Sequence, residues 1–133
     1  VELAEQMDAM GVTADYVYHA TGTGGTMAGL AAGRKLVGSQ TAIRSITVSP
    51  KNADYLTKVQ NLANQVLADL GSDLRVDKDT DLFMDTGYFA PGYEQPNEQA
   101  SEAIKMLARL EGLRDAAHLT LLSILFHRLH LLV

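Results

Sequence analysis

Residues 21–29 read Thr-Gly-Thr-Gly-Gly-Thr-Met-Ala-Gly and combine the residue types that hold a phosphate group. They follow the short apolar run Tyr16-Val-Tyr-His-Ala and open a segment with helical spacing. Glycines let successive backbone N–H groups converge on an anion, and a helix N-terminus adds partial positive charge. We therefore predict a phosphate-binding loop, although a tight turn without a ligand is the simpler alternative. The predicted ligands are Thr21, Gly22, Thr23, Gly24, Gly25 and Thr26.

The details of this loop narrow the class of phosphate ligand. A nucleoside triphosphate loop needs a Lys followed by Ser or Thr at the start of the helix, whereas here Gly25 is followed by Thr26 and Met27. A dinucleotide loop needs three glycines in the pattern G-x-G-x-x-G, and Met27 occupies the third glycine position. A small cofactor with a single phosphate remains, because backbone amides alone can bind it.

Apolar spacing along the chain predicts strands that alternate with helices. The expected strands are 16–19, 42–48 and 82–86, and the expected helices are 2–10, 26–37, 52 or 53–70 and 97–110. Alternation of this kind is typical of an α/β fold in which helices cover both faces of a parallel sheet, in three αβα layers. Ligands in such folds bind at the carboxyl ends of the strands, which is where the glycine loop falls.

The composition excludes several classes of function. The 133 residues carry a net charge of −5, whereas nucleic-acid partners require clustered Lys and Arg. No cysteine is present, so disulfides, thiolate metal sites and a cysteine nucleophile are excluded. The first residues are acidic rather than basic, unlike a signal peptide. We expect a cytoplasmic protein that binds neither nucleic acid nor a membrane.

Two segments together resemble one family of pyridoxal-phosphate enzymes. The loop that begins at His19 is similar to the phosphate loop of the tryptophan-synthase-β-like superfamily, also called fold type II. The segment Gly87-Tyr-Phe-Ala-Pro-Gly-Tyr-Glu-Gln-Pro-Asn-Glu, followed by a helix that ends Ala-Arg-Leu-Glu-Gly, resembles the D-cysteine desulfhydrase and 1-aminocyclopropane-1-carboxylate (ACC) deaminase family. The resemblance covers about residues 1–112, and the uninterrupted Gly24-Gly25-Thr26 favours the desulfhydrase branch.

The resemblance implies a cofactor, a substrate class and a catalytic residue. Pyridoxal 5′-phosphate would be anchored by residues 21–26 and would act as an electron sink for chemistry on a small amino acid. Tyr93 matches an active-site tyrosine of the family, and its phenol would donate a hydrogen bond or a proton near the substrate. A loop aromatic packed on its neighbours is the alternative for Tyr93. The family also suggests a homodimer.

The chain departs from the family pattern in its lysines. In the family, the lysine that forms the Schiff base with the cofactor lies well before the glycine loop. The lysines of this chain are Lys35, Lys51, Lys58, Lys78 and Lys105. None lies in the family's lysine motif, so we interpret them as solvated surface charges and assign no catalytic lysine. Because the sequence also begins without Met, in the middle of a helical pattern, we expect a fragment of a longer enzyme.

The second departure is at the C-terminus, where similarity ends after Gly112. We expect one domain fragment, 1–112, and a divergent apolar helical tail, 113–133, which is too short and too interrupted to span a membrane. His127 and His130 can share a face of that tail helix, but no carboxylate or thiolate lies close by, so we predict no metal site.

Three functional hypotheses therefore stay open. The first is a pyridoxal-phosphate lyase of the D-cysteine desulfhydrase type, which would convert D-cysteine to pyruvate, sulfide and ammonia and would be incomplete in this chain. The second is an ACC deaminase. The third is a non-catalytic remnant that binds phosphate weakly or not at all.

Overall fold

The computed structural model describes residues 1–89, 92 and 98–111, and this part of the chain contains a three-stranded sheet and four helices. The order of elements is α1 (Glu2–Met10), β1 (Tyr16–Thr21), α2 (Gly25–Leu36), β2 (Ala42–Thr47), α3 (Tyr55–Asp69), β3 (Phe83–Asp85) and α4 (Glu98–Glu111). Strands and helices alternate from β1 onward, which confirms the predicted α/β class. No helix within these ranges has the length and apolarity needed to cross a membrane.

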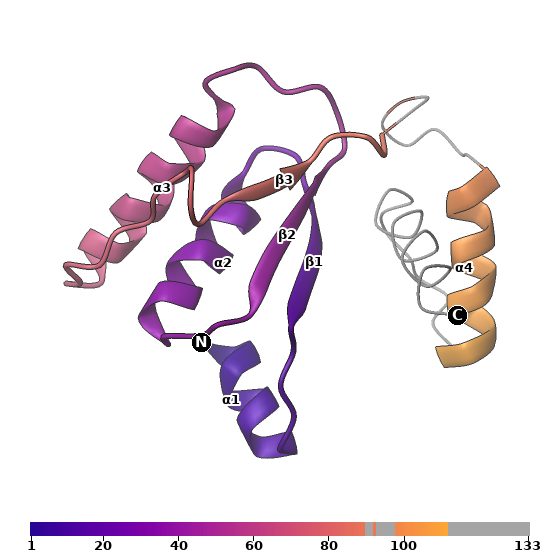
Figure 1. Ribbon diagram of the computed structural model, residues 1–133, viewed down its shortest axis with the longest axis horizontal. Helices are drawn as coiled ribbons and strands as arrows, with labels where there is room; N and C mark the ends of the chain where they lie inside the picture. Colours follow the sequence, from indigo (N-terminus) through magenta and orange to yellow (C-terminus); the bar gives the residue numbers. More distant parts are fainter. Residues whose placement is uncertain (90–91, 93–97, 112–133) are drawn as a thin grey trace.

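All the described strands run in the same direction, in the order β1-β2-β3. The register pairs His19 with Ser45 and Thr21 with Thr47, so the carboxyl ends of β1 and β2 lie at the same edge. Helices α2 and α3 lie on one side of the sheet and α4 lies on the other (Figure 1). This arrangement places the turn from β1 to α2 at the edge where ligands bind in parallel α/β sheets.

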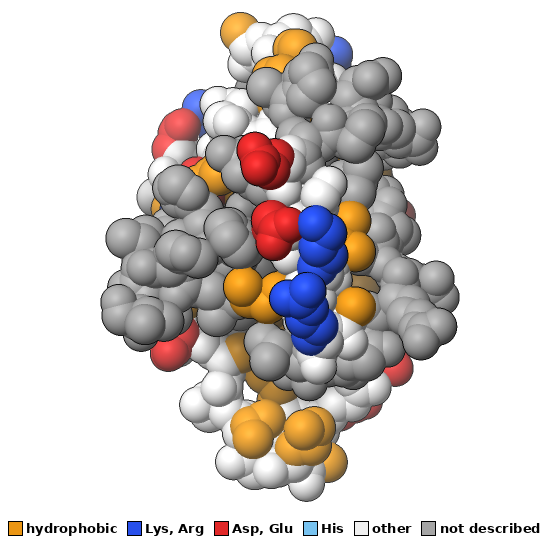
Figure 2. All heavy atoms as spheres, turned by 90° about the vertical axis from the view of Figure 1, so that its right-hand side faces the viewer, with side chains coloured by type: hydrophobic (Ala, Val, Ile, Leu, Met, Phe, Trp, Pro, Cys, Tyr) orange, Lys and Arg blue, Asp and Glu red, His pale blue; other side chains and the backbone are white. Residues whose placement is uncertain are grey.

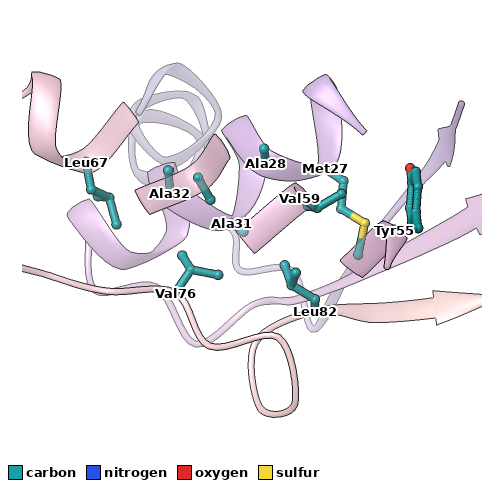
Figure 3. Packing of buried hydrophobic residues seen from close by; sticks show 10 residues of the cluster. Met27, Ala28, Ala31, Ala32, Tyr55, Val59, Leu67, Val76 and Leu82 are labelled. Atoms are coloured by element: carbon teal, nitrogen blue, oxygen red, sulfur yellow. The ribbon is translucent and has the colours of Figure 1, made fainter. Parts of the chain in front are cut away.

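The core lies between α2, α3 and the sheet, and small side chains allow the close approach (Figure 3). Four buried residues of α2, spaced one and three apart, form its inner stripe: Met27, Ala28, Ala31 and Ala32. Four buried residues of α3, each one turn after the last, form the facing stripe: Tyr55, Val59, Ala63 and Leu67. These spacings give each helix one apolar face, as expected for helices packed on a sheet.

The segment between α3 and β3 is fixed to the helices by polar contacts. The side-chain amide of Asn64 donates to the carbonyl of Val76 (3.1 Å) and accepts from the N–H of Val76 (2.7 Å). It thus pairs with both backbone groups of Val76, as the backbone of a neighbouring strand does. The carboxylate of Asp81, which is buried, lies 2.8 Å from Lys35 Nζ and 3.6 Å from Arg34. Lys35 is therefore not the freely solvated charge that we expected from the sequence.

Four charged residues of helix α4 lie on one face. Glu98, Glu102, Lys105 and Arg109 are spaced four, three and four residues apart, which is one helix stripe. Figure 2, which looks onto this side of the molecule, shows acidic and basic side chains in a line across its centre. Lys105 donates to Glu102 at 2.6 Å. This stripe is the solvated face of the helix.

The observed ends of β1 and α3 differ from the predicted ends because of contacts with other parts of the chain. β1 continues two residues past His19, because Ala20 and Thr21 still pair with β2. α3 begins at Tyr55 rather than at residue 52 or 53, since the N–H of Tyr55 bonds to Asn52 in a separate turn. The extension of β1 brings Thr21 to the edge of the sheet directly before the glycines.

Candidate phosphate site

The glycine loop joins β1 to α2 in the three residues between Thr21 and Gly25. Gly24 is the residue that caps the helix, and its φ of 100° lies in the left-handed region that favours glycine. A Cβ at this position would lie 2.7 Å from Val59 Cγ2 and 3.3 Å from the hydroxyl of Tyr55. The backbone of the loop therefore approaches α3 so closely that a side chain on Gly24 has no room.

The N-terminus of α2 offers backbone N–H groups without a competing acceptor from its own side chains. No side chain caps the helix, and its first turn contains no acidic residue. The first N–H groups of any helix lack partners within the helix, and here they carry the positive end of the dipole. Gly22, Thr23, Gly25 and Thr26 are all exposed. These features fit the binding of an anion.

Thr21 and Tyr55 form a buried hydrogen bond that links the start of the loop to α3. Thr21 Oγ1 lies 2.8 Å from the Tyr55 hydroxyl, and the Thr21 side chain is only 1% exposed. Tyr55 opens α3 and points toward the loop, beside Met27 and Val59 (Figure 3). The hydroxyl of Thr21 is thus engaged within the protein, whereas those of Thr23 and Thr26 belong to exposed residues.

The chain that leaves β2 runs alongside the same loop. The N–H of Val48 donates to the carbonyl of Thr21 at 3.3 Å, and Val48 Cγ2 lies 3.7 Å from the position of a Cβ on Gly22. Three residues later, Lys51 donates to Ser49 Oγ at 2.7 Å and lies 5.2 Å from the ring centroid of Tyr55. The loop is therefore flanked on one side by a basic side chain.

His19 lies two residues before the loop, and both of its ring nitrogens have partners. Nδ1 is 3.0 Å from the carbonyl of Ala20, which can only accept, so Nδ1 carries the proton. Nε2 is 2.7 Å from Ser45 Oγ, which donates to it in the neutral form. Burial lowers the pKa of His19, and the bond to Ala20 opposes this only in part. His19 is a satisfied strand histidine, not a cofactor ligand.

This pKa shift predicts a pH dependence of stability. Because the pKa is lower in the folded state, the unfolded chain takes up the proton first, and stability falls as the pH drops below about 6.5. His19→Gln should lose less stability than wild type between pH 7.5 and 5.5, as measured by urea unfolding at each pH. Equal losses in the two proteins would contradict the assignment.

The structure places six of the seven predicted site residues together in the loop. The seventh, Tyr93, lies outside the described residues, as do His118, His127 and His130 of the tail. Sequence reasoning missed Tyr55, which is 34 residues from its partner Thr21 and was not singled out in the predicted helix. Its position at the start of the helix that follows β2, on the carboxyl side of the sheet, is the signal that could have indicated it.

Two cavities in the described part of the chain lie away from the loop. One, of about 80 Å³, is lined by α1 residues such as Met7, by Leu30 and Gly33 of α2, and by Val37, which follows that helix. The other, of about 490 Å³, is lined by α1 and by residues 12–15 and 37–41. Both adjoin the amino ends of β1 and β2, so neither is continuous with the phosphate loop.

Comparison with known proteins identifies the family. The family model for pyridoxal-phosphate dependent enzymes matches residues 1–117. The chain belongs to this family. A crystal structure described as that of an ACC deaminase homologue superposes on this pyridoxal-phosphate family member with a TM-score of 0.77 at 20% sequence identity. The match covers 95% of this chain and 38% of the other, so the two share a fold and this chain spans less than half the length of that protein.

The loop of this family member fits the phosphate of the cofactor on three counts. A Cβ on Gly24 would collide with α3, so the close backbone turn depends on glycine. The helix end has no side-chain cap, and its neighbouring residues are exposed. The flanking lysine adds charge of the right sign. No position for the pyridine ring follows from these residues.

Proposed function

We propose that this chain is part of a pyridoxal-phosphate lyase of the D-cysteine desulfhydrase type, in which residues 21–26 bind the cofactor phosphate. The uncapped start of α2 beside the left-handed Gly24 is the observation that supports this most directly. When bound, the cofactor supplies an electron sink that stabilises a carbanion. The overall reaction would consume D-cysteine and water and release pyruvate, hydrogen sulfide and ammonia.

The chain's own residues have separate roles in this proposal. The N–H groups of the first turn of α2 and the hydroxyls of Thr23 and Thr26 donate to the phosphate, while Thr21 holds the loop against α3. Tyr93 is proposed to act at the substrate as a hydrogen-bond or proton donor. The substrate is a small amino acid, and a homodimer is proposed from the resemblance alone.

Two alternatives each have an observation in their favour. An ACC deaminase is favoured by the likeness to the ACC deaminase homologue. A non-catalytic remnant is favoured by the lysines, because the Nζ of each of the five donates to a serine hydroxyl or a carboxylate. In the remnant, the phosphate loop would persist without a lysine to join the cofactor covalently.

One set of assays tests the phosphate site and separates the two activities. The purified chain is titrated with pyridoxal phosphate and with pyridoxal, and binding is followed by ³¹P NMR and fluorescence. It is then supplied with D-cysteine, with sulfide release measured, or with ACC, with 2-oxobutanoate measured. We expect the phosphate ester to bind more tightly than pyridoxal. Sulfide release would support the desulfhydrase, and 2-oxobutanoate would support the deaminase. Binding without either product is expected both of the remnant and of a part of a larger enzyme. Failure to bind the ester would contradict the proposal.

A further inference from the structure

Lys51 stands apart from the other lysines of the chain because its charge is not neutralised. Lys35, Lys58, Lys78 and Lys105 each lie within 2.8 Å of a carboxylate oxygen. Within the described residues, Lys51 has no such partner and donates instead to the neutral hydroxyl of Ser49 at 2.7 Å. Among the described residues, then, no acidic side chain is paired with this half-buried lysine beside the predicted anion site.

The position of Lys51 is fixed by contacts that also define the loop. Its Nζ lies 5.2 Å from the centroid of the Tyr55 ring, a distance at which a cation is attracted to the ring face. The hydroxyl of the same ring bonds Thr21 and lies beside Gly24. One aromatic side chain therefore touches the loop with its hydroxyl and holds the ammonium against its face.

A phosphate monoester carries nearly two negative charges at neutral pH, but residues 21–26 include no basic side chain. Asp54, which precedes α3 and is three residues after Lys51, is paired with Lys58 at 2.7 Å. A single ammonium held nearby favours a dianion over a neutral or singly charged ligand.

From this arrangement we propose that Lys51, held by Tyr55 and Ser49, selects dianionic phosphate esters at the glycine loop. This inference rests on the proposed phosphate site and deepens it. It gives Lys51 an electrostatic role in phosphate recognition, without a covalent role toward the cofactor aldehyde. Ser49 and Tyr55 act as positioning residues for the ammonium.

The test uses pyridoxine 5′-phosphate, which has no aldehyde, so that no lysine can react with it. Binding of this ester and of pyridoxine is measured by calorimetry for wild type and Lys51→Met. We expect Lys51→Met to bind the ester about fivefold more weakly than wild type, because the variant loses one solvent-screened attraction to the dianionic phosphate. Its affinity for pyridoxine, which has no phosphate, should be unchanged. Raising the ionic strength should shrink the difference, because salt screens the exposed pair.

Lys78→Met is the matched control, since it removes the same charge from a lysine already neutralised by Asp79. It should bind the ester as wild type does. If wild type binds the ester and Lys51→Met binds it equally well at low salt, this inference is wrong while the phosphate site stands. An equal loss in Lys78→Met would also overturn it, since net charge alone would then explain the effect. If wild type shows no preference for the ester over pyridoxine, the proposed site itself fails.

Discussion

Replacing Gly24 by alanine is expected to destabilise the fold by about 2–4 kcal/mol, because the left-handed backbone and the crowded side-chain position act together. The φ of 100° is one that alanine rarely adopts, and the new Cβ would lie 2.7 Å from Val59 Cγ2. Relief of the clash would move α3 away from the loop or turn the loop away from the helix. Urea unfolding measures the loss, and phosphate binding should fall with it.

Gly29→Ala is the control for this prediction. Gly29 lies in the same helix with an ordinary φ, and a Cβ there meets nothing within 4 Å. Alanine at such a helical position should stabilise the protein by up to about 1 kcal/mol. If both substitutions had the same effect on the free energy of unfolding, the constraint on the loop that we assign to Gly24 would be refuted.

Replacing Tyr55 by phenylalanine should destabilise the protein by about 1–3 kcal/mol, since it leaves the buried hydroxyl of Thr21 without its partner. The ring still fills its place in the core, so the change isolates the hydrogen bond. Adding Thr21→Val removes the stranded hydroxyl and should recover part of the loss. The measurement is a double-mutant cycle from urea unfolding of the two single variants, the double variant and wild type.

Tyr16→Phe serves as the matched control because the Tyr16 side chain is 53% exposed on β1. Its effect should stay within about 0.5 kcal/mol. If the effects of Thr21→Val and Tyr55→Phe on the free energy of unfolding were strictly additive, the two hydroxyls would not interact. The proposed support of the loop by this hydrogen bond would then be wrong.

Local patterns in the sequence predicted most of the fold and the location of the site. Apolar spacing indicated the helices that cover the sheet because such a helix buries one face, as in the stripe of α3. The glycines and threonines after β1 indicated the loop because a strand–glycine–helix order is itself a local pattern. These features depend on residues within one or two helical turns of one another.

The contacts that hold the site could not be predicted in this way. Thr21 contacts Tyr55, which is 34 positions later in the sequence. Lys35 contacts Asp81, and both β2 and α3 lie between these two residues in the sequence. Neither pair has a local signature, so Lys35 was interpreted as a surface charge and Tyr55 was not singled out. Lys51 was likewise interpreted as solvated, although it is half-buried against the Tyr55 ring.

The bond between Thr21 and Tyr55 also has a consequence for the order of folding. A contact between residues 34 positions apart closes a long loop, and the entropy of that closure opposes it until the intervening helix and strand are formed. A peptide spanning β1 and α2 would contain every glycine of the motif but not the side chain that braces it. The phosphate loop thus takes its final shape only when α3 has docked.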